Sequence, residues 1–205
     1  MNGKKFMMRN PVLEAIGNRR SVRAYEKDPV SKEVIESIIE AGNQAPCTYP
    51  FQSWRFVVVQ DKEFREKLFQ TVYPIWKESF DGMRGSSDFS GYHEKAMRLL
   101  DKMEEPKDLI YYSAPVILFV IGPETNPVDC GLACENIMIA ATSFGLGSCY
   151  VGFGSLITGN EEVVEELELA EGERIYGPIV LGYPKDLPEE RALRMEKKGP
   201  TVKWV

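Results

Sequence analysis

The stretch VILFVIGPETNPVDCGLACENIMIAATSFGLGSCYV, residues 116–151, decides the fold of this chain. Its uninterrupted apolar run Val116–Ile121 predicts a strand that is buried on both faces. Residues 128–144 are small and apolar over a length too great for a strand, so they predict a central helix. A Gly-Leu-Gly sequence ends this helix, and residues 148–151 predict a short strand after it.

Two helices are predicted on the N-terminal side of this stretch. Asn10 and Pro11 suit the cap and the first position of a helix that ends near Gly17. Ser31 caps a second helix with an apolar stripe, and Gly42 ends it. A basic segment separates the two helices.

Further strands and helices continue an alternating order. Residues 56–59 are β-branched and aromatic, and they predict another strand that is buried on both faces. Asp61 caps a third helix, residues 161–169 predict an acidic helix, and residues 175–183 predict a further internal strand. This order indicates an α+β fold with helices on both sides of one sheet.

The bulk composition indicates a single domain over residues 1–205. No internal repeat or Gly/Ser linker divides the chain, and 43% of its residues are hydrophobic, which is enough for a substantial core. The net charge of −6 argues against nucleic acid or an anionic membrane as a partner, since both require an exposed excess of Lys and Arg. Without a transmembrane run or a secretion signal, we expect a cytoplasmic protein whose four cysteines stay reduced.

Several known site motifs fail on this sequence. The Gly-x-Gly sequence after the central helix cannot bind a dinucleotide pyrophosphate, because that motif must follow a strand. Phe153 stands where a P-loop needs lysine, and His93 is the only histidine, which excludes a multi-His metal site. Cys130 and Cys134 lie one helical turn apart without further ligands nearby. We therefore predict no metal site and interpret both cysteines as core residues.

Three arginines, Arg19, Arg20 and Arg23, cluster around Ser21 in an otherwise acidic chain. The planar guanidinium group suits bidentate recognition of phosphate and can stabilise negative charge on a reduced cofactor. One basic residue alone would complement the dipole of the preceding helix, a contribution of about 0.3–1 kcal/mol. Three arginines therefore indicate a bound anion, and a merely decorated surface stays as the alternative.

This basic segment resembles the Arg-Arg-Ser-x-Arg-x-aromatic opening of the FMN-dependent nitroreductase family. Other segments resemble that family in its order: Ala45–Val59 its Ala-Pro-Ser…Asn-x-Gln-Pro-Trp-x-Phe-x-Val stretch, Asp129–Ala141 its central helix, Gly145–Gly152 its Gly-Leu-Gly-x-Cys-Trp-x-Gly turn, and Gly182–Pro184 its Gly-Tyr-Pro. The likeness spans residues 11–205 apart from 73–112. No single segment is specific, but their common order is not expected by chance.

The resemblance implies a three-layer α/β/α fold around a central, mostly antiparallel sheet, with FMN bound where the two subunits of a homodimer meet. It also implies a C-terminal tail that is exchanged with the partner subunit. The residues implied to bind FMN are Arg19, Arg20, Ser21 and Arg23 at the phosphate, ribityl chain and pyrimidine edge, Pro50, Phe51 and Gln52 from the other subunit, Tyr150, Val151 and Gly152 on the opposite ring face, and Lys197 and Lys198 in the tail.

Two positions depart from the family's pattern. Pro50 replaces the usual Asn, which removes a side-chain amide and a backbone donor. Ser53 replaces the Pro before Trp54, and we expect this change to loosen the loop slightly.

The implied activity is NAD(P)H-dependent reduction of electron-poor acceptors, such as nitroaromatics or quinones, by ping-pong hydride transfer. Because the flavin carries the electrons, no catalytic side chain is predicted. Residues 73–112 are expected to form either a variable lid near the flavin or a surface insertion. Three alternatives stay open: a same-fold flavoenzyme of another chemistry (dehalogenation, dehydrogenation or flavin fragmentation), a non-catalytic flavin-binding protein, and a structural protein without a cofactor.

Overall fold

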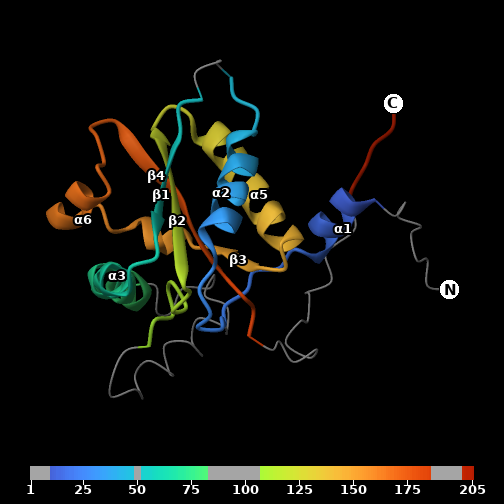
Figure 1. The fold of residues 1–205 in the computed structure, drawn as a ribbon. Helices are drawn as coiled ribbons and strands as arrows, with labels where there is room; N and C mark the ends of the chain where they lie inside the picture. The colour runs from blue at the N-terminus through green and yellow to red at the C-terminus, as the bar shows by residue number, and fades with distance from the viewer. Residues whose placement is uncertain (1–9, 49–51, 83–106, 186–199) are drawn as a thin grey trace.

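A single antiparallel sheet forms the middle layer of the protein. The computed structural model describes residues 10–48, 52–82, 107–185 and 200–205 (Figure 1). Within these residues the sheet has four strands in the order β1-β2-β4-β3, and each neighbouring pair is antiparallel. The strands are β1 (Arg55–Val59), β2 (Val116–Pro123), β3 (Gly147–Tyr150) and β4 (Glu173–Gly182).

Helices cover both faces of this sheet, which confirms the predicted three-layer α+β arrangement. In Figure 1, α2 and α5 lie on one face and α3 and α6 on the other. The helices are α1 (Pro11–Asn18), α2 (Lys32–Asn43), α3 (Lys62–Gly82), α5 (Pro127–Ser143) and α6 (Glu161–Glu166), and η1 (Gly152–Ser155) is a short 3₁₀ helix.

The predicted N-caps are present in the structure. The Asn10 side chain accepts hydrogen bonds from the Val12 and Leu13 amides at the start of α1. Asp61 Oδ1 accepts the Phe64 amide at 2.7 Å at the start of α3. Each cap satisfies backbone donors that the first helical turn leaves unpaired, so these two short side chains fix where the helices begin.

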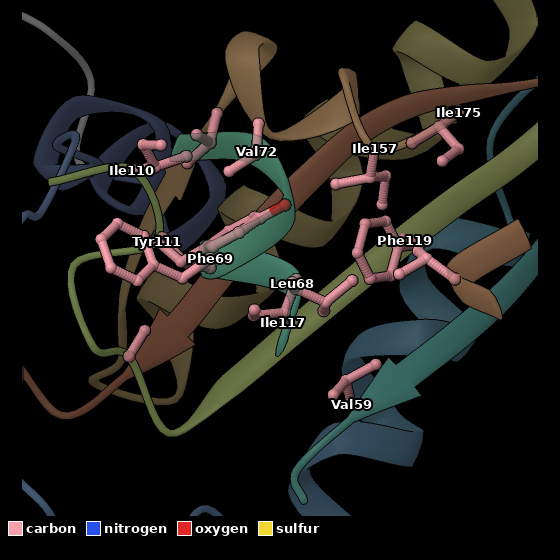
Figure 2. Close-up of a cluster of buried hydrophobic side chains, with 14 of the residues drawn as sticks. Val59, Leu68, Phe69, Val72, Ile110, Tyr111, Ile117, Phe119, Ile157 and Ile175 are labelled. Carbon is pink, nitrogen blue, oxygen red and sulfur yellow. The ribbon is translucent and has the colours of Figure 1, made fainter. Parts of the chain in front are cut away.

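The two interior strands are apolar on both faces because each face packs against a layer of helices. Along β2, Ile117, Phe119 and Ile121 pack on the side of α3 and α6, where Figure 2 shows Phe119 beside Ile157. The alternate residues Val116, Leu118 and Val120 pack against α2 and α5. The strand buried on both faces that the sequence predicts at residues 116–121 is therefore confirmed.

A bulge in β4 shifts the alternation of its side chains by one position. Leu118 pairs with Ile179, whereas Val120 pairs with Tyr176, so β4 carries one extra residue between these pairs. Gly177, with φ of +78°, provides the left-handed backbone that the bulge requires. As a result, Tyr176 and Ile179 both face α5, although an uninterrupted strand would point them to opposite faces.

The prediction that residues 56–59 are buried on both faces is wrong. Strand β1 lies at the edge of the sheet and pairs only with β2 among the described strands. Only Val59 is buried, while the other residues of β1 are half-buried. An apolar run of this length has the same pattern in an edge strand and in an interior strand, so the sequence alone does not distinguish them.

Both ends of the segment 73–112 belong to the core. Helix α3 continues past Pro74 to Gly82, and Trp76 is buried within the cluster on that face of the sheet. Ile110 and Tyr111 are also buried there. Residues 83–106 lie outside the described part of the chain, so the role of this segment as a lid stays a proposal.

The acidic helix α6 is shorter than predicted because Leu167 caps it and Glu168 adopts a left-handed φ of +51°. At the C-terminus, residues 200–205 are exposed, and the exchange of this tail with a partner subunit stays a prediction. None of the described helices is long and apolar enough to cross a membrane.

An ion pair joins the edge strand to the start of β4. The Arg55 guanidinium donates to Glu173 Oε1 at 3.0 Å and Oε2 at 2.7 Å, and it also donates to the carbonyls of Leu167 and Glu168. These hydrogen bonds from Arg55 lower the pKa of the Glu173 carboxyl. A depressed pKa in the folded state adds stability above the unfolded pKa of about 4.3, and this stability is lost as the pH falls through the folded pKa.

We therefore expect Glu173→Gln to lower the free energy of unfolding by about 1–2 kcal/mol at pH 7. The difference from the wild type should shrink as the pH falls below about 4.3, because the wild-type carboxyl becomes protonated first in the unfolded chain and, at lower pH, in the folded protein. Urea unfolding at pH 7 and pH 3.5 measures both values. Glu171→Gln, an exposed position in the preceding turn, is the matched control and should change stability by less than about 0.5 kcal/mol. An equal loss of stability at both pH values would show that the ion pair between Arg55 and Glu173 is not its cause.

Candidate cofactor site

The arginine segment continues the sheet beyond β3. The Val22 amide donates to the Ser148 carbonyl at 2.9 Å, and Ser21 and Ser148 form a parallel bridge. Further along the chain, the Lys185 amide donates to the Ala24 carbonyl at 3.0 Å. The backbone that carries the candidate phosphate ligands is therefore fixed between β3 and the segment that follows β4.

A close contact between Val22 and β3 sets the direction of the neighbouring side chains. Val22 is buried, whereas Ser21 and Arg23 on either side of it are exposed, as expected for an extended segment. Gly147 allows this approach, because a Cβ there would lie 2.7 Å from Val22 Cγ2. The Tyr25 hydroxyl also donates to the Val22 carbonyl at 2.7 Å, and burial raises the pKa of this phenol.

The three arginines have different surroundings. Arg20 Nη1 donates to the Gly17 carbonyl at 2.7 Å and to the Arg19 carbonyl at 2.8 Å, so Arg20 caps the end of α1. Arg19 Nε lies 3.6 Å from the Glu135 carboxylate on α5. Arg23 Nε donates to the Tyr112 hydroxyl at 3.2 Å. One of the three arginines thus performs the helix-capping role that a single basic residue would satisfy.

Arg19 and Arg23 lie at the two ends of a short segment of extended backbone. Four residue steps of extended backbone span up to about 13 Å. The segment thus presents a guanidinium group at each end, with the exposed Ser21 between them. This spacing suits an elongated ligand with one anionic end better than it suits a lone phosphate.

The turn after β3 lies alongside the arginine segment. Because Ser21 and Ser148 bridge in parallel, the arginine segment lies beside β3, which ends at Tyr150. Tyr150 is 47% exposed, and a Cβ added at Gly152 would meet no atom of the described chain within 4 Å. An exposed aromatic side chain beside an open backbone surface suits a flat ring.

The β4 bulge fixes the position of this turn. The Val151 amide donates to the Pro178 carbonyl at 2.8 Å, and the Tyr150 hydroxyl accepts the Gly177 amide at 3.1 Å. The Val151 side chain is buried. Of the three residues predicted on this ring face, Tyr150 and Gly152 are therefore the two that present an open surface.

Gln52 lies at the opposite edge of the sheet from the arginines. It precedes β1, while the arginine segment borders β3, and two strands separate these edges. Its amide Nε2 donates to the Asn43 carbonyl at 2.8 Å, and its φ is +40°. Pro50, Phe51, Lys197 and Lys198 lie outside the described residues. The structure thus brings Arg19, Ser21 and Arg23 together with Tyr150 and Gly152, and it does not bring Gln52 to them within one chain.

Two further side chains beside the site are absent from the predicted set. Tyr112 contacts Arg23, and Asp108 organises the turn that carries Tyr112. They were missed because residues 73–112 have no resemblance to the family's pattern. An Asp five residues before a Ser in a polar segment is too common to signal a site.

The cysteines and acidic residues offer no metal centre within the described part of the chain, where no cluster of three His, Cys, Asp or Glu could hold an ion. Cys130 and Cys134 are buried on α5, as predicted. Burial raises the pKa of the Cys130 thiol to about 11 and that of the Cys134 thiol to about 12. Both thiols therefore stay protonated and act as small core side chains.

Gly147→Ala is expected to disturb the site through Val22. The new methyl group would lie 2.7–2.8 Å from three carbons of this stiff, β-branched side chain, so the arginine segment must move away from β3. We expect a loss of about 1–3 kcal/mol in the free energy of unfolding together with weaker FMN binding. Thermal unfolding and a fluorescence titration measure the two effects.

The matched control is Gly159→Ala, since a Cβ at Gly159 meets nothing within 4 Å in the described chain. This variant should match the wild type in both measurements. Unchanged FMN affinity in Gly147→Ala would show that the contact between Val22 and Gly147 does not set the geometry of the arginines.

Comparison with known proteins identifies the family. The model of the Nitroreductase family matches residues 16–183. The FMN reductase (NAD(P)H) of Bacillus subtilis is 28% identical over 197 residues, which cover 91% of this chain and 74% of that protein.

Two crystal structures of nitroreductases with bound FMN are also similar. The one from Bacteroides fragilis is 30% identical, with a TM-score of 0.71, and the match covers 96% of this chain and all of that one. The one from Desulfitobacterium hafniense is 27% identical, with a TM-score of 0.68 and coverage of 97% and 100%. With the arginine segment, the β3 turn and the antiparallel sheet all in that family's order, the chain belongs to the nitroreductase family.

Proposed function

We propose that this protein is an FMN-dependent oxidoreductase that uses NAD(P)H to reduce electron-poor acceptors such as nitroaromatics or quinones. The observation that carries the proposal is the parallel placement of the arginine segment beside β3, which leads into the exposed turn at Tyr150 and Gly152. The FMN found in two related crystal structures supports the choice of cofactor. When bound, FMN supplies two-electron transfer between NAD(P)H and the acceptor.

We assign the residues of the arginine segment to different parts of FMN, in an order that their spacing supports. Arg19 and Arg20, next to the end of α1, bind the phosphate, together with Lys197 and Lys198 of the tail. Ser21 hydrogen-bonds the ribityl chain, and Arg23 reaches the pyrimidine edge. The donor chemistry fits, because guanidinium groups suit a phosphate and a hydroxyl group suits a polyol.

Arg23 has a chemical role as well as a binding role. FMN, when bound and reduced, would carry negative charge near N1 of the pyrimidine edge, and the Arg23 guanidinium would stabilise that charge. Tyr150 and Gly152 border the opposite face of the ring. No histidine base is needed for this chemistry, in agreement with the single histidine of the chain.

We propose that the active form is a homodimer. Gln52 precedes β1, and the arginine segment that carries Arg23 lies beyond β3, about 19 Å from β1 across four strand spacings, so a ligand that contacts both requires a second copy. In that dimer Pro50, Phe51 and Gln52 come from the partner subunit. Apolar side chains that one chain leaves exposed support the proposal; they include Val12 on α1 at 62%, Val128 on α5 at 70% and Trp204 in the tail at 92%.

NAD(P)H and the acceptor would occupy the same space above the ring in turn, which is a ping-pong cycle. Residues 73–112 are proposed as the lid that sets acceptor choice, since α3, which leads into this segment, and Tyr111 near its end both contact η1. All four cysteines are free, which suits the reducing cytoplasm as the place of action.

The test is a visible spectrum of the purified protein before and after anaerobic NADH or NADPH. We expect a yellow protein whose flavin absorption bleaches with at least one of the two and returns with a nitroaromatic or a quinone. Bleaching without return would favour another flavin chemistry, and bound FMN without bleaching would favour a non-catalytic protein. A colourless protein that takes up no added FMN would overturn the proposal.

A further inference from the structure

We infer that Tyr112 is a positioning residue for Arg23, and that its hydroxyl orients this guanidinium toward the cofactor. The inference rests on the proposed function, because it assigns Arg23 to the pyrimidine edge of FMN. It goes beyond that function by adding a residue from a segment without resemblance to the family's motifs.

The contact between the two side chains has a defined geometry. Arg23 Nε donates to the Tyr112 hydroxyl at 3.2 Å, and the guanidinium carbon lies 5.9 Å from the centre of the Tyr112 ring. Arg23 Nη1 also donates to the Ser21 carbonyl at 3.3 Å. These two hydrogen bonds hold the guanidinium from two sides, which leaves its plane fewer orientations than a solvated arginine has.

The backbone that carries Tyr112 is strained. Tyr112 has φ of +57° and Ser113 has φ of +50°, so two consecutive residues with side chains adopt the left-handed conformation. This conformation is unfavourable for residues other than glycine, and it persists only where the surroundings enforce it. Such strain concentrates at functional sites, where it holds a side chain in a required position.

The Asp108 carboxylate enforces the strained turn. Its Oδ1 accepts the amides of Ile110 at 3.1 Å and Tyr111 at 2.7 Å, and its Oδ2 accepts the amide of Ser113 at 2.8 Å. Three backbone donors around one half-buried carboxylate define the path of the chain through Tyr112.

Two further hydrogen bonds attach this turn to the rest of the site. The Tyr111 hydroxyl donates to the Gly154 carbonyl in η1 at 2.8 Å, and Tyr111 is buried. Arg65 Nη1 on α3 donates to the Ala114 carbonyl at 2.7 Å. The Tyr112 hydroxyl is thus fixed relative to η1, which begins at Gly152 on the proposed ring face.

The fixed hydroxyl acts on the redox balance of the cofactor through Arg23. A cation held at the pyrimidine edge binds reduced FMN, which carries negative charge there, more strongly than oxidised FMN. If Arg23 is free to rotate, this preference weakens. Loss of the Tyr112 hydroxyl should therefore weaken the binding of reduced FMN more than that of oxidised FMN.

The experiment compares the wild type with Tyr112→Phe, which keeps the ring and removes only the hydroxyl. The readouts are the Kd of the apoprotein for oxidised FMN, from fluorescence titration, and the midpoint potential of bound FMN, from equilibration with a reference dye. We expect a threefold to tenfold greater loss of affinity for reduced than for oxidised FMN, which lowers the potential by about 15–30 mV.

Two controls separate positioning from a general loss of structure. Tyr176→Phe also removes a hydroxyl that donates one hydrogen bond, to the Pro123 carbonyl at 2.8 Å. Tyr176 lies in the first half of β4, whereas the second half pairs with β3 beside the site. The midpoint potential of FMN in this variant should equal that of the wild type. In an Arg23→Gln background, Tyr112→Phe should cause no further shift, because the group that it positions is gone.

The outcomes distinguish this inference from the proposed function. If the wild type takes up no FMN, the proposed function fails and the role of Tyr112 with it. If the wild type binds FMN and Tyr112→Phe keeps its potential, or shifts equally with and without Arg23, only the positioning role is overturned. Should Tyr112→Phe fail to fold, Asp108→Asn, which weakens the same turn, must lower the potential for the inference to hold.

Discussion

Replacing Arg19 and Arg23 together by glutamine is expected to weaken FMN binding by about a hundredfold to ten-thousandfold. Each arginine contributes a charge-assisted hydrogen bond, and such a bond is worth about 1.5–3 kcal/mol. Two of them therefore account for about 3–6 kcal/mol of binding free energy, at 1.4 kcal/mol for each factor of ten. The two positions lie at opposite ends of the extended segment, so their contributions should be nearly additive.

A fluorescence titration of the apoprotein with FMN measures the loss. The fold should remain intact, because the contact between Arg19 and Glu135 is half-exposed and contributes little to stability. Lys27→Gln with Lys32→Gln removes two positive charges from exposed positions outside the site and should leave the Kd within twofold. If both double variants weaken binding equally, the arginines act only through net charge.

Phe119→Ala should lower the free energy of unfolding by about 3–5 kcal/mol. Phe119 lies in the interior strand β2, opposite Val57 on β1, and no part of it is exposed. Figure 2 shows its ring within the cluster between α3 and the sheet, beside Ile157. The substitution removes most of a large side chain from a closely packed core, and the surrounding elements can fill the cavity only in part.

Urea unfolding followed by circular dichroism measures this loss. Phe119→Leu keeps most of the apolar volume and should cost no more than about half as much as the alanine variant. If the alanine variant lost less than about 1.5 kcal/mol, this side of the sheet would not be a close-packed core.

Local signals in the sequence predict where many of the elements lie. The cap at Asn10, the cap at Asp61 and the apolar run in β2 each depend on a few neighbouring residues. Such signals fix the ends of helices and the existence of strands, because the hydrogen bonds that they satisfy are local.

Features that depend on distant contacts were not predicted. The run Phe56–Val59 has the composition of an interior strand, yet its neighbours in the sheet make it an edge. The bulge at Gly177 needs a partner strand for its definition. No local sequence pattern predicts the edge position of β1 or the bulge in β4, since strand order is set by the packing of the whole chain.

The candidate site likewise has parts that the local sequence predicts and parts that depend on distant contacts. The arginine segment and the turn after β3 could be predicted because both resemble contiguous motifs of a known family. The contact between Arg23 and Tyr112 joins positions 89 residues apart. It follows from the turn around Asp108, which a single sequence does not reveal.

The bulge in β4 also limits how this sheet can be redesigned. Because β2 and β4 are apolar on both sides, hydrophobic patterning does not dictate which residues meet which helical layer. The additional residue, at Gly177 and Pro178, decides which helical layer each later residue of β4 faces. The backbone of the same two residues also anchors Tyr150 and Val151. A circular permutant, or a graft of this strand into another scaffold, must therefore retain the Gly-Pro pair to keep its two sides in place.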